Sequence, residues 1–338
     1  MPTREGRHNV LIGKHFYKTK PLPYKTHNMT RSTHPLLQLL VMLAIALGLL
    51  LVTSAASGIL IIASGIDITT RQSMLWLQGI TQIITFALPV LLIGIIYYRG
   101  QQRDFYRANF AGHYWLVGLA GVIIMLLLNP LNDWLSVWNE SWDLGAVGEA
   151  LHSIQDQTEG LLEELMDTTS VGGLLANLLV VALIPAVTEE LFFRCGIQNL
   201  LQRWLRNPHV AIWLTAIIFS LGHGELYSFM PRLVMGATLG YLYIYGGSLV
   251  PNMLAHFANN AIVVVIYWLA TRGTLDIDPN EPMHFGWTLT ACCTIAALFL
   301  GYIVLLKNRK LTDSRAACTD GTPDKQQLTQ PENKITTD

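Results

Sequence analysis

Two adjacent glutamates and an arginine lie inside a long apolar stretch of this sequence. Glu189, Glu190 and Arg194 stand in the string EELFFR, and residues 172–202 carry no other charge. Residues four apart share a helix face, and Glu before Arg is the favourable order, so Glu190 and Arg194 are predicted to pair. Glu189 then points about 100° away from Glu190. With a weaker partner in an apolar setting, the Glu189 carboxylate suits the role of a general base.

Two later apolar runs carry groups that could act together with this base. His223 ends a short run in the string FSLGH, between two glycines that permit a bend or a close approach of the backbone. His256 and Asn260 are four residues apart in the following long run, so they share one helix face. A His and an Asn on one face can both donate hydrogen bonds to a developing oxyanion. No Ser or Cys in these runs stands out as a nucleophile, and the pattern therefore indicates hydrolysis by an activated water.

The order of these motifs carries a family resemblance. EExxxR, FxxxH and HxxxN follow one another, each in its own apolar run. This resembles the CPBP superfamily of intramembrane proteases, which includes the CAAX prenyl endopeptidases and the bacteriocin-processing proteins of the Abi family. The resemblance covers roughly residues 170–270, and the arrangement of about eight spans is similar too.

The resemblance implies a role for each motif residue. Three pairs are implied: Glu189 and His223 position and activate the hydrolytic water, His256 and Asn260 stabilise the oxyanion, and Glu190 and Arg194 hold the site together. By ligand chemistry, Glu189, His223 and His256 could hold a zinc ion. The chain has no HExxH string, and these three residues come from separate runs. We therefore expect no tightly bound metal or other cofactor.

Each motif also has an ordinary structural interpretation. Glu190 and Arg194 can form a purely structural ion pair inside the membrane. His256 and Asn260 can join neighbouring helices by hydrogen bonds, and a lone His223 at the end of a span is commonly an interfacial residue. Only the combination of the three motifs favours a catalytic site over these alternatives.

Composition places these motifs in a membrane protein. The chain has 338 residues, of which 51% are hydrophobic and only 13% charged, whereas soluble domains average about 25% charged residues. The net charge of -1 gives no indication of a nucleic-acid partner. The apolar runs predict an all-α, polytopic membrane protein with about eight transmembrane helices. The expected spans are 35–66, 72–98, 113–131, 172–204, 210–222, 233–245, 249–270 and 285–306.

Charge along the chain predicts five parts and an orientation. The parts are a basic cytoplasmic arm (1–34), three N-terminal transmembrane helices (35–131), an acidic amphipathic segment outside the cytoplasm (132–170), a catalytic membrane core of five helices (171–306) and a disordered cytoplasmic tail (307–338). Lys and Arg gather in alternate loops, so the positive-inside rule puts both termini in the cytoplasm. Arg232 is the exception to this alternation. Asn252, beside Pro251, is expected to cap the start of the seventh span.

These observations lead to one leading hypothesis and two alternatives. The leading one is a multi-pass endopeptidase of the cell membrane whose partners are the bilayer and a membrane-associated peptide or protein, of prenylated CAAX type or bacteriocin-like. The first alternative is a non-catalytic immunity or scaffold protein that uses the same polar cluster for binding or stability. A proton-coupled transporter could also use buried carboxylates, but the two halves show no repeat and no matching pair of broken helices.

Overall fold

The protein is helical throughout the part of the chain that the computed structural model describes, residues 33–64, 70–108 and 112–319. No strand occurs within these ranges. The helices are α1 (Pro35–Ser64), α2 (Arg71–Gln82), η1 (Ile83–Ala87), α3 (Leu88–Tyr97), α4 (Gln102–Tyr106), α5 (Gly112–Glu140), α6 (Gly145–Met166), α7 (Val171–Asn177), η2 (Leu178–Leu183), α8 (Ile184–Glu189), η3 (Glu190–Gln198), α9 (Asn199–Leu205), α10 (Pro208–Leu221), η4 (Leu226–Ser228), α11 (Phe229–Gly246), α12 (Val250–Thr271) and α13 (Trp287–Thr319). Helices η1, η2 and η3 are π-helical, and η4 is a 3₁₀ turn. The expectation of an all-α fold is confirmed.

Six helical segments among the described residues are long and apolar enough to cross a bilayer. They are Pro35–Ile59, Arg71–Tyr97, Tyr114–Glu140, Val171–Leu205, Val250–Thr271 and Trp287–Val304. Two of them are continuous rods of several elements, α2–η1–α3 and α7–η2–α8–η3–α9. The shorter apolar helix α10 and the 18-residue helix α11 stand where the fifth and sixth spans are predicted. An expected count of about eight is therefore compatible with the structure.

Local sequence signals set where the helices of the predicted core begin and end. The Ser170 side chain accepts a hydrogen bond from the Gly173 amide and caps α7, and Asn207 caps α10 just before Pro208. In both caps, the side-chain oxygen accepts a hydrogen bond from a backbone amide that has no partner within the first turn of the helix. Gly247, at φ +76°, ends α11 in the left-handed region.

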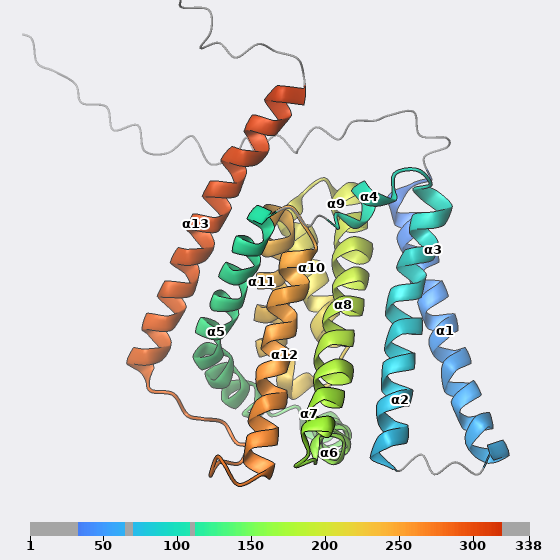
Figure 1. Cartoon of the computed structure of the whole chain (residues 1–338), viewed down its shortest axis with the longest axis vertical. Helices are drawn as coiled ribbons and strands as arrows, with labels where there is room; N and C mark the ends of the chain where they lie inside the picture. Colours follow the sequence, from blue (N-terminus) through green and yellow to red (C-terminus); the bar gives the residue numbers. More distant parts are fainter. Residues whose placement is uncertain (1–32, 65–69, 109–111, 320–338) are drawn as a thin grey trace, which may run out of the picture. The chain divides into compact units, whose positions relative to one another are not determined.

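The rod α7–α9 lies among other helices on several sides. Helix α12 packs against α8, η2, α5 and α11, and α10 packs against α11, α9 and η3. The rod α2–η1–α3 runs along α8 and η3 (Figure 1). Side chains from α12, α10 and the rod α2–η1–α3 can therefore approach the part of the rod α7–α9 that carries Glu189 and Glu190.

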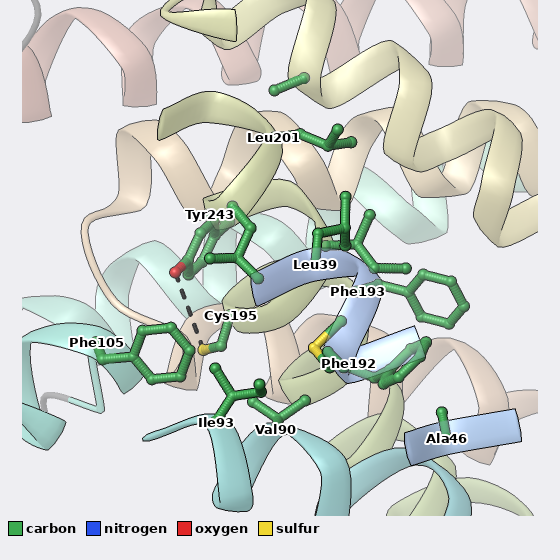
Figure 2. Close-up of a cluster of buried hydrophobic side chains, with 14 of the residues drawn as sticks. Leu39, Ala46, Val90, Ile93, Phe105, Phe192, Phe193, Cys195, Leu201 and Tyr243 are labelled. Atoms are coloured by element: carbon green, nitrogen blue, oxygen red, sulfur yellow. Dashed lines mark hydrogen bonds between the residues drawn. The ribbon is translucent and has the colours of Figure 1, made fainter. Parts of the chain in front are cut away.

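A buried apolar cluster fixes η3 against the N-terminal helices (Figure 2). Phe192, Phe193 and Cys195 of η3 belong to it. The Cys195 thiol is fully buried and donates to the Tyr106 carbonyl at 3.1 Å. Ile197 of η3 belongs to the cluster as well. The other members come from α1, α3 and its C-cap, α4, α9, α10, α11 and the turn before α12: Leu39, Met42, Ala46, Val90, Ile93, Tyr98, Phe105, Leu200, Leu201, Ala211, Phe219, Tyr243 and Leu249. This packing sets the rotation of η3 and therefore the direction of its charged side chains.

Helix α5 continues beyond the predicted end of the third span. It runs to Glu140, although a polar segment is expected from residue 132. The reason is visible at Asn139, which is fully buried: it accepts a hydrogen bond from the Met230 amide at 2.7 Å and donates to the Leu226 carbonyl at 3.0 Å. The end of α5 thereby holds η4 and the start of α11, the segment that follows His223.

Helix α6 occupies the predicted acidic amphipathic segment. Leu165 and Met166 are buried, whereas Ile154 and Leu161 are exposed. The Arg71 guanidinium joins α2 to this region by donating to the Leu165 carbonyl at 2.9 Å and to the Asn177 side chain at 2.6 Å.

Two further observations bear on the predicted parts of the chain. Arg232, the exception to the charge alternation, forms an ion pair with Glu225, which lowers the cost of its charge. Helix α13 continues to Thr319, so the structure differs from the expected disordered tail up to that residue. The Lys, Leu, Arg and Ala of 307–317 are good helix formers. The remainder of the tail, 320–338, and nearly all of the basic arm lie outside the described residues.

Candidate active site

The rod α7–α9 changes from α-helix to π-helix between the two adjacent glutamates. Glu189 is the last residue of α8, and Glu190 is the first of η3. A π-helix has wider turns than an α-helix, and π-helical turns within α-helices are frequent at functional sites. In η3 the side chains of Glu190, Arg194 and Gln198 follow one another on one face, each bonded to the next.

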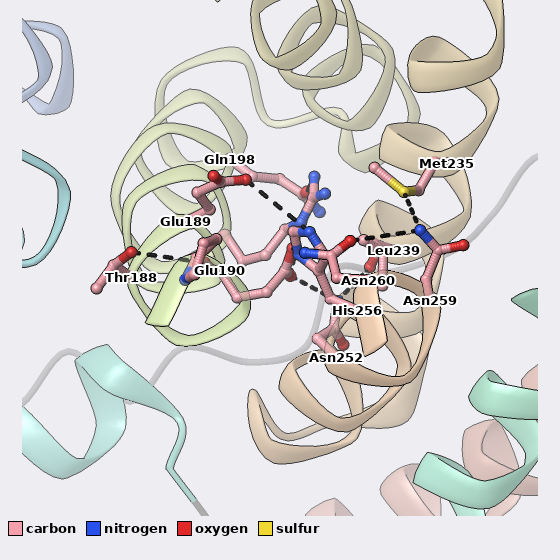
Figure 3. Close-up of polar contacts among 12 residues, drawn as sticks. Thr188, Glu189, Glu190, Gln198, Met235, Leu239, Asn252, His256, Asn259 and Asn260 are labelled. Atoms are coloured by element: carbon pink, nitrogen blue, oxygen red, sulfur yellow. Dashed lines mark hydrogen bonds and ion pairs between the residues drawn. The ribbon is translucent and has the colours of Figure 1, made fainter. Parts of the chain in front are cut away.

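Glu190 lies at the centre of a buried network (Figure 3). Its Oε2 accepts from Arg194 Nε at 3.0 Å and from Asn252 Nδ2 at 3.2 Å, and its Oε1 accepts from His256 Nδ1 at 3.1 Å. Glu190 and Arg194 are 0% exposed. An ionised carboxylate has about four acceptor positions, and three of those on Glu190 are filled. Glu190 is thus held as a neutralised, structural carboxylate.

Arg194 extends the network toward α10 and α11. Its Nη1 donates to Gln198 Oε1 at 3.3 Å, and Gln198 Nε2 donates to the Gly240 carbonyl at 3.0 Å. The guanidinium carbon lies 5.7 Å from the centre of the Phe219 ring, within the range of a cation–π contact. These further bonds satisfy part of the buried ion pair, whereas Arg194 Nη2 is buried and has no hydrogen-bond partner among the described residues.

Glu189 has different surroundings. It is 7% exposed, and its Oε1 accepts one hydrogen bond, from Gln82 Nε2 at 3.2 Å. Its Oε2 lies 3.9 Å from His256 Nε2, which is beyond a direct hydrogen bond. The Glu189 carboxylate therefore keeps free acceptor positions on the side that faces His256.

His256 lies between the two carboxylates. Because the Glu190 carboxylate only accepts, we assign the donated proton to His256 Nδ1. In a neutral ring, Nε2 is then the nitrogen that can accept a proton on the Glu189 side. One turn further along α12, Asn260 Oδ1 accepts from Asn259 Nδ2 at 3.4 Å. The amide nitrogen of Asn260 makes no hydrogen bond to any of the described residues.

His223 follows the end of α10 and is held against Phe219 of that helix. Its Nδ1 is 2.8 Å from the Phe219 carbonyl oxygen, and its ring centre is 4.8 Å from that of Phe219. The Phe219 ring in turn lies 6.2 Å from the ring of His256. The structure thus brings Glu189, Glu190, Arg194 and His256 together, and the rings of His223 and His256 both lie near the Phe219 ring.

This geometry does not fit a zinc site built from the suggested ligands. Within the described ranges, no group of three or more His, Cys, Asp or Glu side chains is arranged to hold a metal ion. The hydrogen bonds of His256 Nδ1 to Glu190 and of His223 Nδ1 to a backbone carbonyl leave each Nε2 free among the described residues, but these two rings and Glu189 are not gathered around one point. No step of the chemistry is therefore routed through a metal.

Three residues of the site are absent from the sequence prediction. Asn252 is fully buried and bonds to Glu190 instead of capping α12, whose cap position is Leu249. Its spacing of four from His256 was a usable signal, as was the spacing of Gln198 from Arg194. No spacing within a helix indicates Gln82, because it lies in a different span from Glu189.

Comparison with known proteins bears on the same part of the chain. Residues 171–262 match the family model described as type II CAAX prenyl endopeptidase Rce1-like. The resemblance to the CPBP superfamily is confirmed over this segment. No curated protein and no solved structure gives a match. The matched segment runs from α7 into α12 and contains all three motifs, and it supports protease activity of a membrane-embedded chain in the broad sense.

Proposed function

We propose that this chain is an intramembrane endopeptidase that hydrolyses a peptide bond of a membrane-associated substrate with a water activated by Glu189. The observation that carries the proposal is the difference in hydrogen bonding between the two adjacent carboxylates. Glu190 accepts three hydrogen bonds and is neutralised by Arg194, whereas Glu189 accepts one and faces His256. The match of residues 171–262 to a family of prenyl endopeptidases supports the same reaction class.

The chemistry follows from the free acceptor positions. A water bound to Glu189 gives it a proton as the oxygen attacks the substrate carbonyl carbon, and the carbonyl becomes a tetrahedral oxyanion. The unbonded amide of Asn260, one turn from His256, is a donor for that oxyanion. The C–N bond then breaks, and the proton passes through Glu189 to the leaving amine. Glu190 fixes the ring of His256, whose Nε2 stays available on the Glu189 side.

The substrate is a peptide or protein held at the membrane by a lipidated or embedded end. Reporters that share one peptide sequence, with and without a prenylated cysteine near the C-terminus, distinguish a CAAX-type substrate from an unmodified bacteriocin-like one. We expect cleavage only of reporters that are anchored in the membrane.

Purified protein in lipid vesicles tests the proposal. It should cleave an anchored reporter, and Glu189→Ala should abolish cleavage while expression and unfolding stay unchanged. Full cleavage by the Glu189→Ala variant would overturn the assignment. A non-catalytic role in immunity or scaffolding would instead appear as a cellular phenotype that survives this substitution.

A further inference from the structure

Gln82 is the residue outside the family-matched segment that touches Glu189. It lies in the second predicted span, about one hundred residues before the EExxxR motif. Its Nε2 donates to Glu189 Oε1 at 3.2 Å. A carboxylate can only accept, so the amide must present its nitrogen to Glu189 and its oxygen elsewhere.

The side-chain oxygen of Gln82 provides the second observation. Gln82 Oε1 is buried and has no hydrogen-bond partner among the described residues. Buried acceptors are rarely left unpaired, and those that are commonly bind an ordered water or a ligand. The unpaired oxygen belongs to the same amide group that holds Glu189, so a water bound there lies beside the candidate base.

The local backbone supports the same conclusion. Gln82 ends α2, and the π-helical turn η1 begins at the next residue. Three residues on, Thr85 Oγ1 is also buried and unpaired among the described residues. The segment η1 packs on both α8 and η3. A widened turn with two unpaired oxygens therefore lies along the part of the rod that carries the two glutamates.

We propose that Gln82 is a positioning residue of the site: its Nε2 fixes the Glu189 carboxylate, and its Oε1 accepts a hydrogen bond from the water that Glu189 activates. The inference rests on the proposed function and extends the site to the N-terminal helices. Water, held by two acceptors, then has one hydrogen directed to Glu189 and the other to Gln82. One of its two lone pairs points to the substrate carbonyl carbon.

Steady-state kinetics of Gln82→Met test this role, because methionine keeps the length of the side chain and removes both polar atoms. A hydrogen bond to a charged group is typically worth enough to change a rate about 10- to 100-fold. We expect kcat to fall by about that factor while KM stays within about twofold, since Gln82 touches the water and not the substrate. Gln78→Met is the matched control, because Gln78 lies one turn earlier on α2 and makes no side-chain hydrogen bond to the described residues.

The outcomes separate this inference from the proposed function. If Glu189→Gln is inactive and Gln82→Met has the kcat of the parent, only the role of Gln82 is wrong. A loss that appears in KM alone, or an equal loss in Gln78→Met, also overturns it. If Glu189→Gln keeps full activity, the proposed function fails instead.

A second measurement does not require turnover. Dicyclohexylcarbodiimide is an apolar reagent that reacts with protonated carboxyl groups, and peptide mapping reports the rate at Glu189. An amide donor stabilises the ionised carboxylate, so Gln82→Met should speed labelling of Glu189 several-fold, and Gln78→Met should not. Equal labelling rates in the parent and in Gln82→Met would contradict the proposed hydrogen bond.

Discussion

Neighbouring residues of one chain can differ in chemistry because their partners come from other helices. Helical spacing alone predicted that Glu190 pairs with Arg194, and the structure has this pair at 3.0 Å. His256 and Asn252 add two further donors to Glu190. Their spacing of four predicts that they share a face of α12, but not that this face meets Glu190. The contact of Gln82 with Glu189 is unpredictable for the same reason. Patterns within a single helix therefore predict a residue's partners on that helix and not its partners on other helices.

The ion pair with Glu190 predicts that Arg194 contributes to the stability of the fold. Removing one partner of a buried ion pair typically costs about 3 to 5 kcal/mol, because the other charge stays buried and uncompensated. Arg194→Met should lower the free energy of unfolding by about this amount in a fixed detergent. Denaturant unfolding measured by circular dichroism gives the value.

The double variant provides the control for this prediction. Glu190→Gln combined with Arg194→Met removes both charges, so most of the lost stability should return. An Arg194→Met variant as stable as the parent would mean that the buried ion pair between Glu190 and Arg194 does not form.

At the scale of elements, the path of the rod α7–α9 decides which side chains meet. Apolar periodicity predicted one long helix over 172–204, and a continuous rod runs over Val171–Leu205. Its π-helical turns were not predictable, because no residue type in η2 or η3 separates a π-helix from an α-helix. Both turns pack against other helices, η2 against α12, and η3 against α10 and the N-terminal helices. The position of His223 depends on tertiary packing too, since its ring and that of His256 both lie near the Phe219 ring.

Close packing of α11 on this rod predicts a sensitive glycine. A Cβ at Gly240 would lie 2.8 Å from Ile212 Cγ2 and 3.1 Å from Gln198 Oε1. Gly240→Ala should therefore push α11 away from α10 and weaken the Gln198 bond to the Gly240 carbonyl. We expect a loss of about 1 to 3 kcal/mol of stability together with reduced cleavage.

Gly48 provides the comparison for Gly240. A Cβ at Gly48, also within a predicted span, would meet no atom within 4 Å. Gly48→Ala should leave stability unchanged or raise it by up to about 1 kcal/mol, the helix-propensity gain. Equal effects of the two substitutions in the same unfolding assay would rule out the packing argument.

At the scale of the whole molecule, the sequence predicted the class and approximate number of membrane helices. Long apolar runs suffice for this prediction, because a segment inside the bilayer must pair its backbone N–H and C=O groups with one another and therefore forms a helix. The ends were less predictable. The tertiary bonds of Asn139 accompany the extension of α5 past its apolar stretch, and α13 continues to Thr319 through residues that favour a helix. Orientation rests on the distribution of Lys and Arg alone and stays a prediction.

Orientation can be measured with single cysteines at exposed positions on either side of the rod α7–α9. Glu164 lies in α6, before the rod, and Arg206 follows its end. A membrane-impermeant maleimide applied to intact cells should label Glu164→Cys and leave Arg206→Cys unlabelled until the membrane is opened. The parent chain, with its native cysteines, reports the background, and the reverse pattern would put both termini outside the cytoplasm.

The central claim is that Glu189 is the base of a water-dependent peptidase. The most direct measurement compares the rate of reporter cleavage in vesicles by the parent, Glu189→Gln and Glu164→Gln. Glu164 belongs to the chain's other Glu-Glu pair, on exposed α6, so it controls for loss of a carboxylate. General-base catalysis typically contributes about 10²- to 10⁴-fold, so Glu189→Gln should lose at least about 100-fold and Glu164→Gln should match the parent. Parent-like cleavage by Glu189→Gln would contradict the account.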